Sequence, residues 1–150
     1  MDKRWNHYFF GSVMRNACMS KDKNTQVGAI IFSEEDKVEI SSGWNDLPRG
    51  MQHTEERNSR PLKYKLTAHA EANSIANAAR MGRATKGMSL AVSMFPCSIC
   101  AGLIVNAGIK RVYAPCPDFN HAQYGEDFKL SLDIFNECGV ELNYVKDLEK

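Results

Sequence analysis

The chain has 150 residues, of which 43% are hydrophobic and 25% are charged. Its 19 basic and 18 acidic residues leave a formal net charge of +1, which argues against a long nucleic-acid partner, because such partners need a basic surface. The length suits one domain, so we expect a single domain over residues 1–150. No apolar run approaches a membrane span, no signal peptide is evident, and five cysteines suit a reducing compartment; we therefore expect a cytoplasmic protein with no membrane partner.

The hydrophobic pattern predicts a helix, then a hairpin, then alternating helices and strands. Apolar residues recur at helical spacing over 4–19, and the β-branched runs 26–32 and 38–42 flank a charged turn. A Gly- and Pro-rich loop follows at 43–50, and the polar segment 51–66 is expected to be loop or short helix. The elements predicted after it are helix 68–80, strand 88–95, a helix from Pro96 to about Gly108, strand 111–114, helix 126–138 and strand 140–145.

This alternation of helices and strands is typical of an α/β fold. It predicts a mostly parallel sheet that is covered by helices on both faces and begins with an antiparallel hairpin. Ligand sites in such sheets lie at the carboxyl ends of strands. The helix that starts at Pro96 follows one of these ends, so we expect a site there.

Two short motifs carry side chains that bind metals. A His-Ala-Glu triplet begins at His69, and a Pro-Cys-Ser-Ile-Cys run supplies Cys97 and Cys100. One His and two Cys make three ligands, the number found at catalytic zinc sites, where the fourth position stays open for water. Glu71 lies two residues after His69 and is placed to take the proton of that water.

Each of these motifs also has an ordinary interpretation. A lone Cys-x-x-Cys pair often marks structural zinc or a redox site, and a helical Glu is usually a solvated charge. The combination is more informative, because Thr67 is a candidate N-cap of one helix and Pro96 suits the first position of the next. Helix starts also favour thiolates. A non-catalytic zinc module that binds a partner remains an alternative, which a turnover measurement would exclude.

A His-x-Glu triplet followed by Pro-Cys-x-x-Cys is the signature of zinc-dependent nucleobase deaminases. The chain resembles the cytidine deaminase-like superfamily over nearly its whole length, and within it the deoxycytidylate (dCMP) deaminase family. Beyond the zinc motifs, the resemblance rests on stretches within 20–29, 43–50, 63–73 and 95–97. It implies a three-layer α/β/α sandwich with a five-stranded mixed sheet. It also implies hydrolysis of dCMP to dUMP and ammonia, which supplies dUMP for thymidylate synthesis.

The superfamily leaves other substrates open. A tRNA adenosine deaminase or a free cytosine deaminase would use the same zinc chemistry. The near-neutral charge argues against the tRNA substrate, and the extended segment 50–66 suits an enzyme that acts on a nucleotide.

The resemblance also assigns roles to single residues. His69, Cys97 and Cys100 match the zinc ligands, and Glu71 matches the proton shuttle. Asn45 matches an asparagine that faces the substrate in the family. The other residues expected at the substrate are Ala70, Phe95, Pro96 and Tyr124.

Family members commonly form hexamers that dCTP activates and dTTP inhibits, with Mg²⁺ at a second site. By resemblance we expect a homo-oligomer, with the hexamer as its form, that responds to dCTP and dTTP. The residues expected at the effector site are Lys21, Asn24, Trp44 and Arg49. The chain departs from the family pattern at Trp44, where Tyr is more common, and at Asp46, where Gly is common.

Overall fold

The structure is a computed structural model that describes residues 1–146. Its helices and strands in chain order are α1 (Lys3–Ala17), β1 (Gly28–Ser33), β2 (Val38–Trp44), α2 (Lys63–Leu66), α3 (Ala70–Arg80), β3 (Ser89–Val92), α4 (Ser98–Asn106), β4 (Arg111–Ala114), α5 (Gly125–Glu137) and β5 (Glu141–Tyr144). Each predicted helix and strand is present in the predicted order, with its ends shifted by a few residues. Among the described helices, none combines the length and apolar character needed to cross a membrane.

The five strands form one mixed sheet in the order β2-β1-β3-β4-β5. This confirms the predicted five-stranded mixed sheet, but the sheet is not mostly parallel. β1 runs antiparallel to both β2 and β3, and only the β3–β4 and β4–β5 pairings are parallel. The difference arises because β1, and not β2, pairs with β3. All of β1 is buried, whereas most of β2 is partly exposed. The more apolar strand of the hairpin therefore lies inside the sheet and β2 forms its edge.

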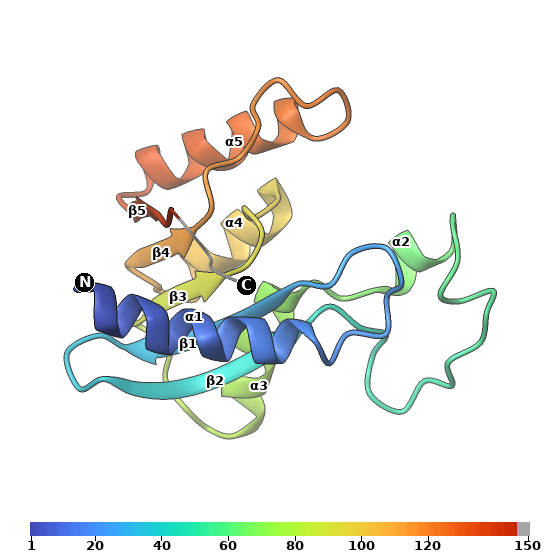
Figure 1. Cartoon of the computed structure of the whole chain (residues 1–150), viewed down its shortest axis with the longest axis horizontal. Helices are drawn as coiled ribbons and strands as arrows, with labels where there is room; N and C mark the ends of the chain where they lie inside the picture. Colours follow the sequence, from blue (N-terminus) through green and yellow to red (C-terminus); the bar gives the residue numbers. More distant parts are fainter. Residues whose placement is uncertain (147–150) are drawn as a thin grey trace.

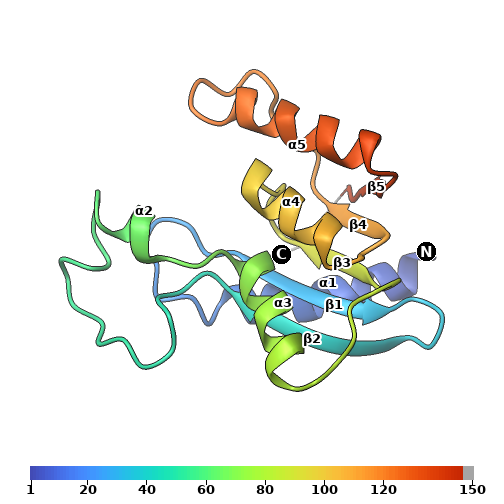
Figure 2. The same cartoon turned by 180° about the vertical axis from the view of Figure 1, so that it is seen from behind.

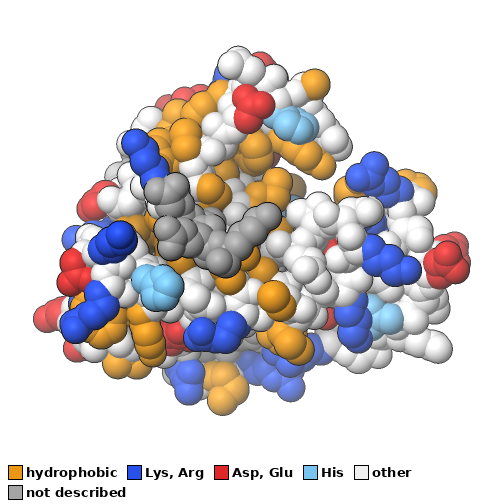
Figure 3. Space-filling view, in the orientation of Figure 1, with side chains coloured by type: hydrophobic (Ala, Val, Ile, Leu, Met, Phe, Trp, Pro, Cys, Tyr) orange, Lys and Arg blue, Asp and Glu red, His pale blue; other side chains and the backbone are white. Residues whose placement is uncertain are grey.

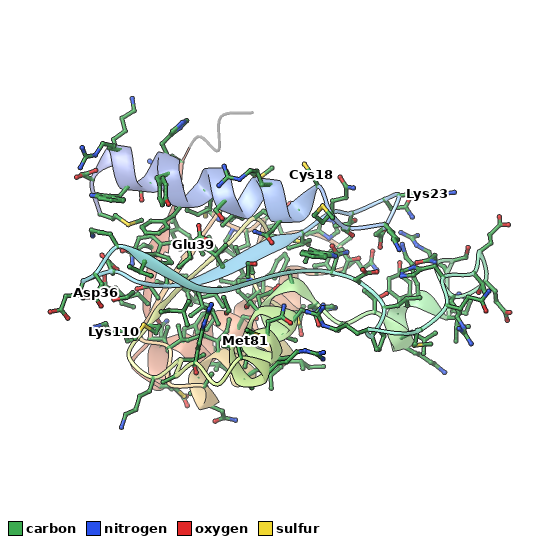
Figure 4. All side chains as sticks on the ribbon, turned by 90° about the horizontal axis from the view of Figure 1, so that it is seen from below. Cys18, Lys23, Asp36, Glu39, Met81 and Lys110 are labelled. Carbon is green, nitrogen blue, oxygen red and sulfur yellow. The ribbon has the colours of Figure 1, made fainter. Side chains whose placement is uncertain are left out.

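Helices cover the sheet on both faces and make the three predicted layers. α1 lies across one face (Figure 1), and α3, α4 and α5 cover the other (Figure 2), as the view from below also shows (Figure 4). Successive β1 side chains point to opposite faces. Phe32 meets α1, where its ring stacks on Phe9 with centroids 4.1 Å apart. Ile31 belongs to the core on the other face.

The residues between β2 and α3 extend away from the sheet. We call residues 45–66, which include α2, the projecting segment (Figure 1). It returns to the sheet through a short antiparallel bridge in which the Asp46 N–H donates to the Ala68 carbonyl at 3.1 Å and the Ala68 N–H donates to the Asp46 carbonyl at 2.9 Å. This bridge keeps Ala68 extended, so α3 begins at Ala70 with His69 as its N-cap. The prediction of Thr67 as N-cap is therefore wrong.

The carboxyl ends of β2 and β3 lie at the same edge of the sheet. Trp44, the last residue of β2, pairs with Gly28 at the start of β1, and Val92 at the end of β3 pairs with the next residue, Ala29. The starts of α3 and α4 follow these ends. The structure therefore brings the two metal-binding motifs to the predicted edge of the sheet.

Candidate metal centre and active-site cavity

Two helix starts bring the three predicted ligands together. His69 is the N-cap of α3, Cys97 is the N-cap of α4, and Cys100 lies in the first turn of α4. His69 Nδ1 is 3.4 Å from Cys97 Sγ and 3.5 Å from Cys100 Sγ, and the three donor atoms all lie within 4.8 Å of one another. One imidazole nitrogen and two thiols at this spacing fit a tetrahedral zinc ion with one position left open. Within residues 1–146, no other group of three such side chains converges in this way.

The N-cap side chains of α3 and α4 face the cluster instead of capping their helices. Neither His69 nor Cys97 makes a side-chain capping hydrogen bond, although N-cap residues usually do. At the start of α4, a carboxylate from α5 caps the helix instead. The Ser98 N–H donates to Asp127 Oδ2 at 2.9 Å, and the Ser98 hydroxyl donates to Asp127 Oδ1 at 2.6 Å. Pro96 was predicted at the first helical position, but it lies before the N-cap because Ser98 is the first helical residue.

The two thiols differ sharply in acidity. Hydrogen bonds from Cys100 and, to a smaller extent, from His69 together lower the pKa of Cys97 to about 4, against the effect of burial. The same thiol–thiol hydrogen bond, together with burial, raises the pKa of Cys100. The hydrogen bond to Cys97 raises the pKa of His69. The cluster therefore holds one thiolate that a cation can bind, and a bound zinc ion would replace the remaining proton.

Glu71 is a buried carboxyl group beside the cluster. It lies in the first turn of α3, and only 4% of its surface is exposed. Burial raises its pKa above the ordinary range of a glutamate, because the charged form loses its hydration. A solvated surface charge would show neither property. A carboxyl group held in this way is suited to take up and release a proton.

The cluster and Glu71 open into a cavity of about 320 Å³, which we call the main cavity. It appears as the hollow between the loop before α5 and the projecting segment (Figure 3). The residues that line it are Asp22, Thr25, Val27, Asn45, Arg60, Lys63, Tyr64, Thr67, His69, Ala70, Glu71, Met94, Phe95, Cys97, Tyr124, Asp127 and Phe128. Four of the residues predicted at the substrate therefore line the main cavity. Pro96 is fully buried and does not.

Asn45 holds the amino end of β1 in place at the wall of the main cavity. Its Oδ1 accepts from the Val27 N–H at 2.9 Å, and its Nδ2 donates to the Thr25 carbonyl at 2.9 Å. An asparagine side chain has two N–H donors and two acceptor lone pairs. One donor and one lone pair therefore remain for a ligand.

Several residues of the main cavity were not predicted from the sequence. Asp127 and Phe128 come from α5, and no motif in the sequence connects that helix with the metal ligands. Arg60 and Lys63 lie in the polar segment that was expected to be loop or short helix. Their positive charge was the one signal in the sequence that could have suggested a role in binding. Tyr64 follows directly in α2.

A second cavity, of about 300 Å³, lies on the other side of the chain at 43–47, and we call it the side cavity. Three residues predicted at an effector site line it, namely Lys21, Trp44 and Arg49, whereas Asn24 does not. Asp46 also faces the side cavity: it accepts from the Trp44 indole N–H at 3.2 Å and lies 3.4 Å from His53 Nε2. Trp44 and Asp46, the two positions at which the sequence departs from the family pattern, therefore contact each other.

Comparisons with known proteins agree with this geometry. The profile of the family described as "Cytidine and deoxycytidylate deaminase zinc-binding region" matches residues 3–116. A protein of Aliivibrio fischeri named "Uncharacterized deaminase in luxG 3'region" is 35% identical over 147 residues, which cover 97% of this chain and 96% of that protein. Human deoxycytidylate deaminase is 36% identical over 143 residues, which cover 91% of this chain and 76% of the human protein.

A solved structure has the same fold. The dCMP deaminase from the cyanophage S-TIM5, determined in complex with dCMP and dUMP, superposes with a TM-score of 0.77 at 23% identity. The superposition covers 97% of this chain and 99% of the cyanophage chain.

Proposed function

Since the chain belongs to the cytidine and deoxycytidylate deaminase family and is a hydrolytic deaminase, we propose that it converts dCMP to dUMP and ammonia. The family and the enzyme class are those predicted from the two zinc motifs and their flanking stretches. The proposal concerns the substrate, the ion and the residues that act, within one catalytic domain over residues 1–150.

One observation carries the proposal: the cluster of His69, Cys97 and Cys100 lies beside the buried Glu71 in a cavity. The cluster has three donors and leaves a position open, as catalytic zinc sites do. The curated relatives include deoxycytidylate deaminases, and the cyanophage enzyme was solved with dCMP and dUMP. These relatives support dCMP as the substrate of this chain.

Zinc bound by the three ligands would lower the pKa of a water toward about 7 and so supply the attacking oxygen. The Glu71 carboxylate accepts a proton from the water that adds to C4 of cytosine, and it delivers this proton to N3. It then passes the second proton of the water to the amino group. The C4–N4 bond breaks, ammonia leaves, and the uracil carbonyl remains. Phe95 and Tyr124 supply apolar walls for the base, and Asn45 offers its remaining donor and lone pair to the nucleotide.

The test is a deamination assay on zinc-loaded protein with five substrates, namely dCMP, CMP, deoxycytidine, cytosine and adenosine in a tRNA anticodon stem. We expect dCMP to be turned over with the highest kcat/KM. Zinc-loaded protein that turns over one of the others instead would contradict the proposed substrate, and protein that turns over none would contradict the catalytic role.

We further propose that the side cavity binds effector nucleotides, dCTP with Mg²⁺ as activator and dTTP as inhibitor. Lys21 and Arg49 supply cations for a triphosphate there. A path to the main cavity is short, because Asp46 faces the side cavity and its backbone pairs with Ala68, the residue before His69. Loss of the dCTP response in a Lys21→Ala, Arg49→Ala double variant would support this assignment, and an unchanged response would refute it.

We also propose a homo-oligomer, with the hexamer as the expected form. α4 has no charged residue, and its outer face exposes Ile99 and Leu103, which are 76% and 41% exposed in the single chain. An apolar helix that is exposed in the monomer is typical of a subunit contact. Light scattering at two protein concentrations would test this, and a monomer at both would contradict it.

A further inference from the structure

The charged side chains around the main cavity are unevenly distributed. Glu71 and Asp127 place two carboxyl groups at the end that holds the metal ligands. Arg60 and Lys63, in the projecting segment, place two cations at the opposite side, where Asp22 also lines the cavity and pairs with Lys63. Figure 3 shows Lys and Arg side chains on the part of the projecting segment that borders the hollow. A ligand that carries a negative group at one end would therefore bind in one orientation.

Lys63 is held firmly in this arrangement. Its side chain is only 7% exposed, and its Nζ lies 3.3 and 3.4 Å from the two carboxylate oxygens of Asp22. Asp22 is itself fixed, because it also accepts the backbone N–H groups of Asn24 at 2.8 Å and Thr25 at 3.1 Å. A lysine ammonium has three donors, so one remains for a ligand after the two contacts with Asp22.

Arg60 has no such partner. Within residues 1–146 its guanidinium lies within salt-bridge distance of no carboxylate and makes no hydrogen bond. It lies over the ring of Tyr64, with its central carbon 5.6 Å from the ring centroid, and Lys63 Nζ lies 5.6 Å from the same centroid. Both cations thus lie 5.6 Å from the centroid of the same tyrosine ring. We call Arg60, Lys63 and Tyr64 the basic corner.

A guanidinium that is free of carboxylates and borders a cavity is suited to a phosphate, because its planar fork can donate two parallel hydrogen bonds to phosphate oxygens. The base must reach Glu71 and the metal ligands to react. The far end of a nucleotide then points away from the two carboxyl groups, toward the side of the cavity that the basic corner lines.

We propose that Arg60 binds the 5′-phosphate of the substrate and so makes the enzyme select nucleotides over nucleosides. Lys63 supplies the remaining donor, and Tyr64 keeps the guanidinium at the cavity. This inference rests on the proposed function, since it takes a deoxycytidine nucleotide as the substrate class of the main cavity.

The test compares substrates with and without the phosphate. In zinc-loaded full-length protein, kcat/KM is measured for dCMP and for deoxycytidine in wild type, Arg60→Ala and Arg60→Lys. We expect Arg60→Ala to lower the dCMP-to-deoxycytidine ratio of kcat/KM by about 10- to 100-fold, the scale of a lost charge-assisted phosphate contact. Arg60→Lys should recover part of the ratio, because a lysine keeps the charge but lacks the fork.

Arg57→Ala is the matched control. Arg57 lies in the same segment, but its guanidinium donates to the Gln52 carbonyl at 2.9 Å and does not line the main cavity. Its removal should leave the ratio unchanged. An Arg60→Ala ratio equal to that of wild type would overturn the inference, and so would an equal fall of the ratio in Arg57→Ala.

A binding measurement separates this inference from the proposed function. Calorimetry compares dUMP with deoxyuridine on zinc-loaded wild type and Arg60→Ala. If wild type turned over no dCMP but bound dUMP more tightly than deoxyuridine only while Arg60 was present, the proposed function would fail and the inference would stand. Equal affinity of wild type for dUMP and deoxyuridine would overturn the inference whatever the turnover.

Discussion

The metal-binding cluster and the basic corner line the same cavity but are built in different ways. The cluster lies at the starts of α3 and α4, and Asp127 ties the start of α4 to α5. The basic corner lies on the projecting segment, whose regular structure within the described residues is the four-residue helix α2. Under the two proposals, the chemical step would depend on helices that are packed in the core, whereas selection among ligands would depend on a projecting segment.

The largest expected effect tests the rigid side of this comparison. In Glu71→Gln the side chain keeps its shape but no longer accepts a proton, so kcat for dCMP should fall at least about 100-fold, the scale of one general acid/base. Zinc content, measured by atomic absorption, should stay at the wild-type level. A near-normal rate in zinc-loaded Glu71→Gln protein would remove the proposed role of this residue.

The second prediction concerns the contact that holds α3 against the sheet. A Cβ added at Gly43 would lie 2.6 Å from the Ser74 nitrogen and 2.9 Å from the Ala70 carbonyl oxygen, and both are backbone atoms that cannot rotate away. Gly43→Ala should therefore lower the free energy of unfolding by about 1–3 kcal/mol, the usual cost of overpacking, as measured by urea titration.

Gly102→Ala is the control for that experiment. A Cβ at Gly102, on α4, would meet no atom within 4 Å, and alanine favours a helix by about 1 kcal/mol over glycine. Its free energy of unfolding should be unchanged or higher. An equal fall in the free energy of unfolding of the two variants would show that the close approach of β2 to α3 does not explain the effect of Gly43→Ala.

The third prediction asks whether α5 supports the metal ligands. Asp127→Ala removes the carboxylate that bonds both the N–H and the hydroxyl of Ser98, next to Cys97. Zinc affinity should fall about tenfold, the lower end for groups that orient metal ligands, in a competition with a chromophoric chelator. Asp133→Ala, an exposed site on the same helix, should keep the wild-type affinity, and a matching loss there would contradict the role of Asp127.

The smallest effect concerns the ion pair beneath the basic corner. Burial raises the pKa of Asp22, but the backbone hydrogen bonds from Asn24 and Thr25 and the contact with Lys63 outweigh it, so the net pKa is below the ordinary value. Such a carboxylate stabilises the fold above its unfolded pKa, near 3.9, and the contribution disappears as the pH falls through the lower folded pKa. Wild type should exceed Asp22→Asn in stability at pH 6, and this margin should shrink below about pH 4.

Thermal unfolding at both pH values would measure that margin. Asp133→Asn, at an exposed position on α5, serves as the control variant and is measured at the same two pH values. A margin for Asp22→Asn that stayed constant down to pH 3 would mean that the ion pair adds nothing in the folded state.

The parts that were predictable from the sequence are those that local patterns determine. His69, Cys97 and Cys100 fall within two short motifs, and the pattern of apolar residues was enough to place every helix and strand except α2, which lies in a segment expected to be loop or short helix. The parts that were missed depend on contacts between distant residues. α3 starts later than predicted because Ala68 pairs with Asp46 across 22 positions in the chain, and no local signal reveals such a bridge.

The same reason explains the other differences. Asp127 reaches Ser98 from another helix, so only the packing of α5 on α4 makes it part of the site. The apolar residues of β1 indicate burial, but they do not reveal that β1, and not β2, pairs with β3. In the sequence, the basic corner was visible only as scattered positive charge. Only the folded structure shows that these side chains line the main cavity.

The most direct measurement is ammonia release from dCMP by the full chain after zinc removal and after zinc reloading, with enzyme concentration fixed. If the cluster and Glu71 form the catalytic centre, the stripped protein should release no ammonia above the uncatalysed rate, and reloading with one zinc ion per chain should restore turnover. Reloaded protein that holds one zinc ion per chain and still releases no ammonia from dCMP would contradict the proposed function.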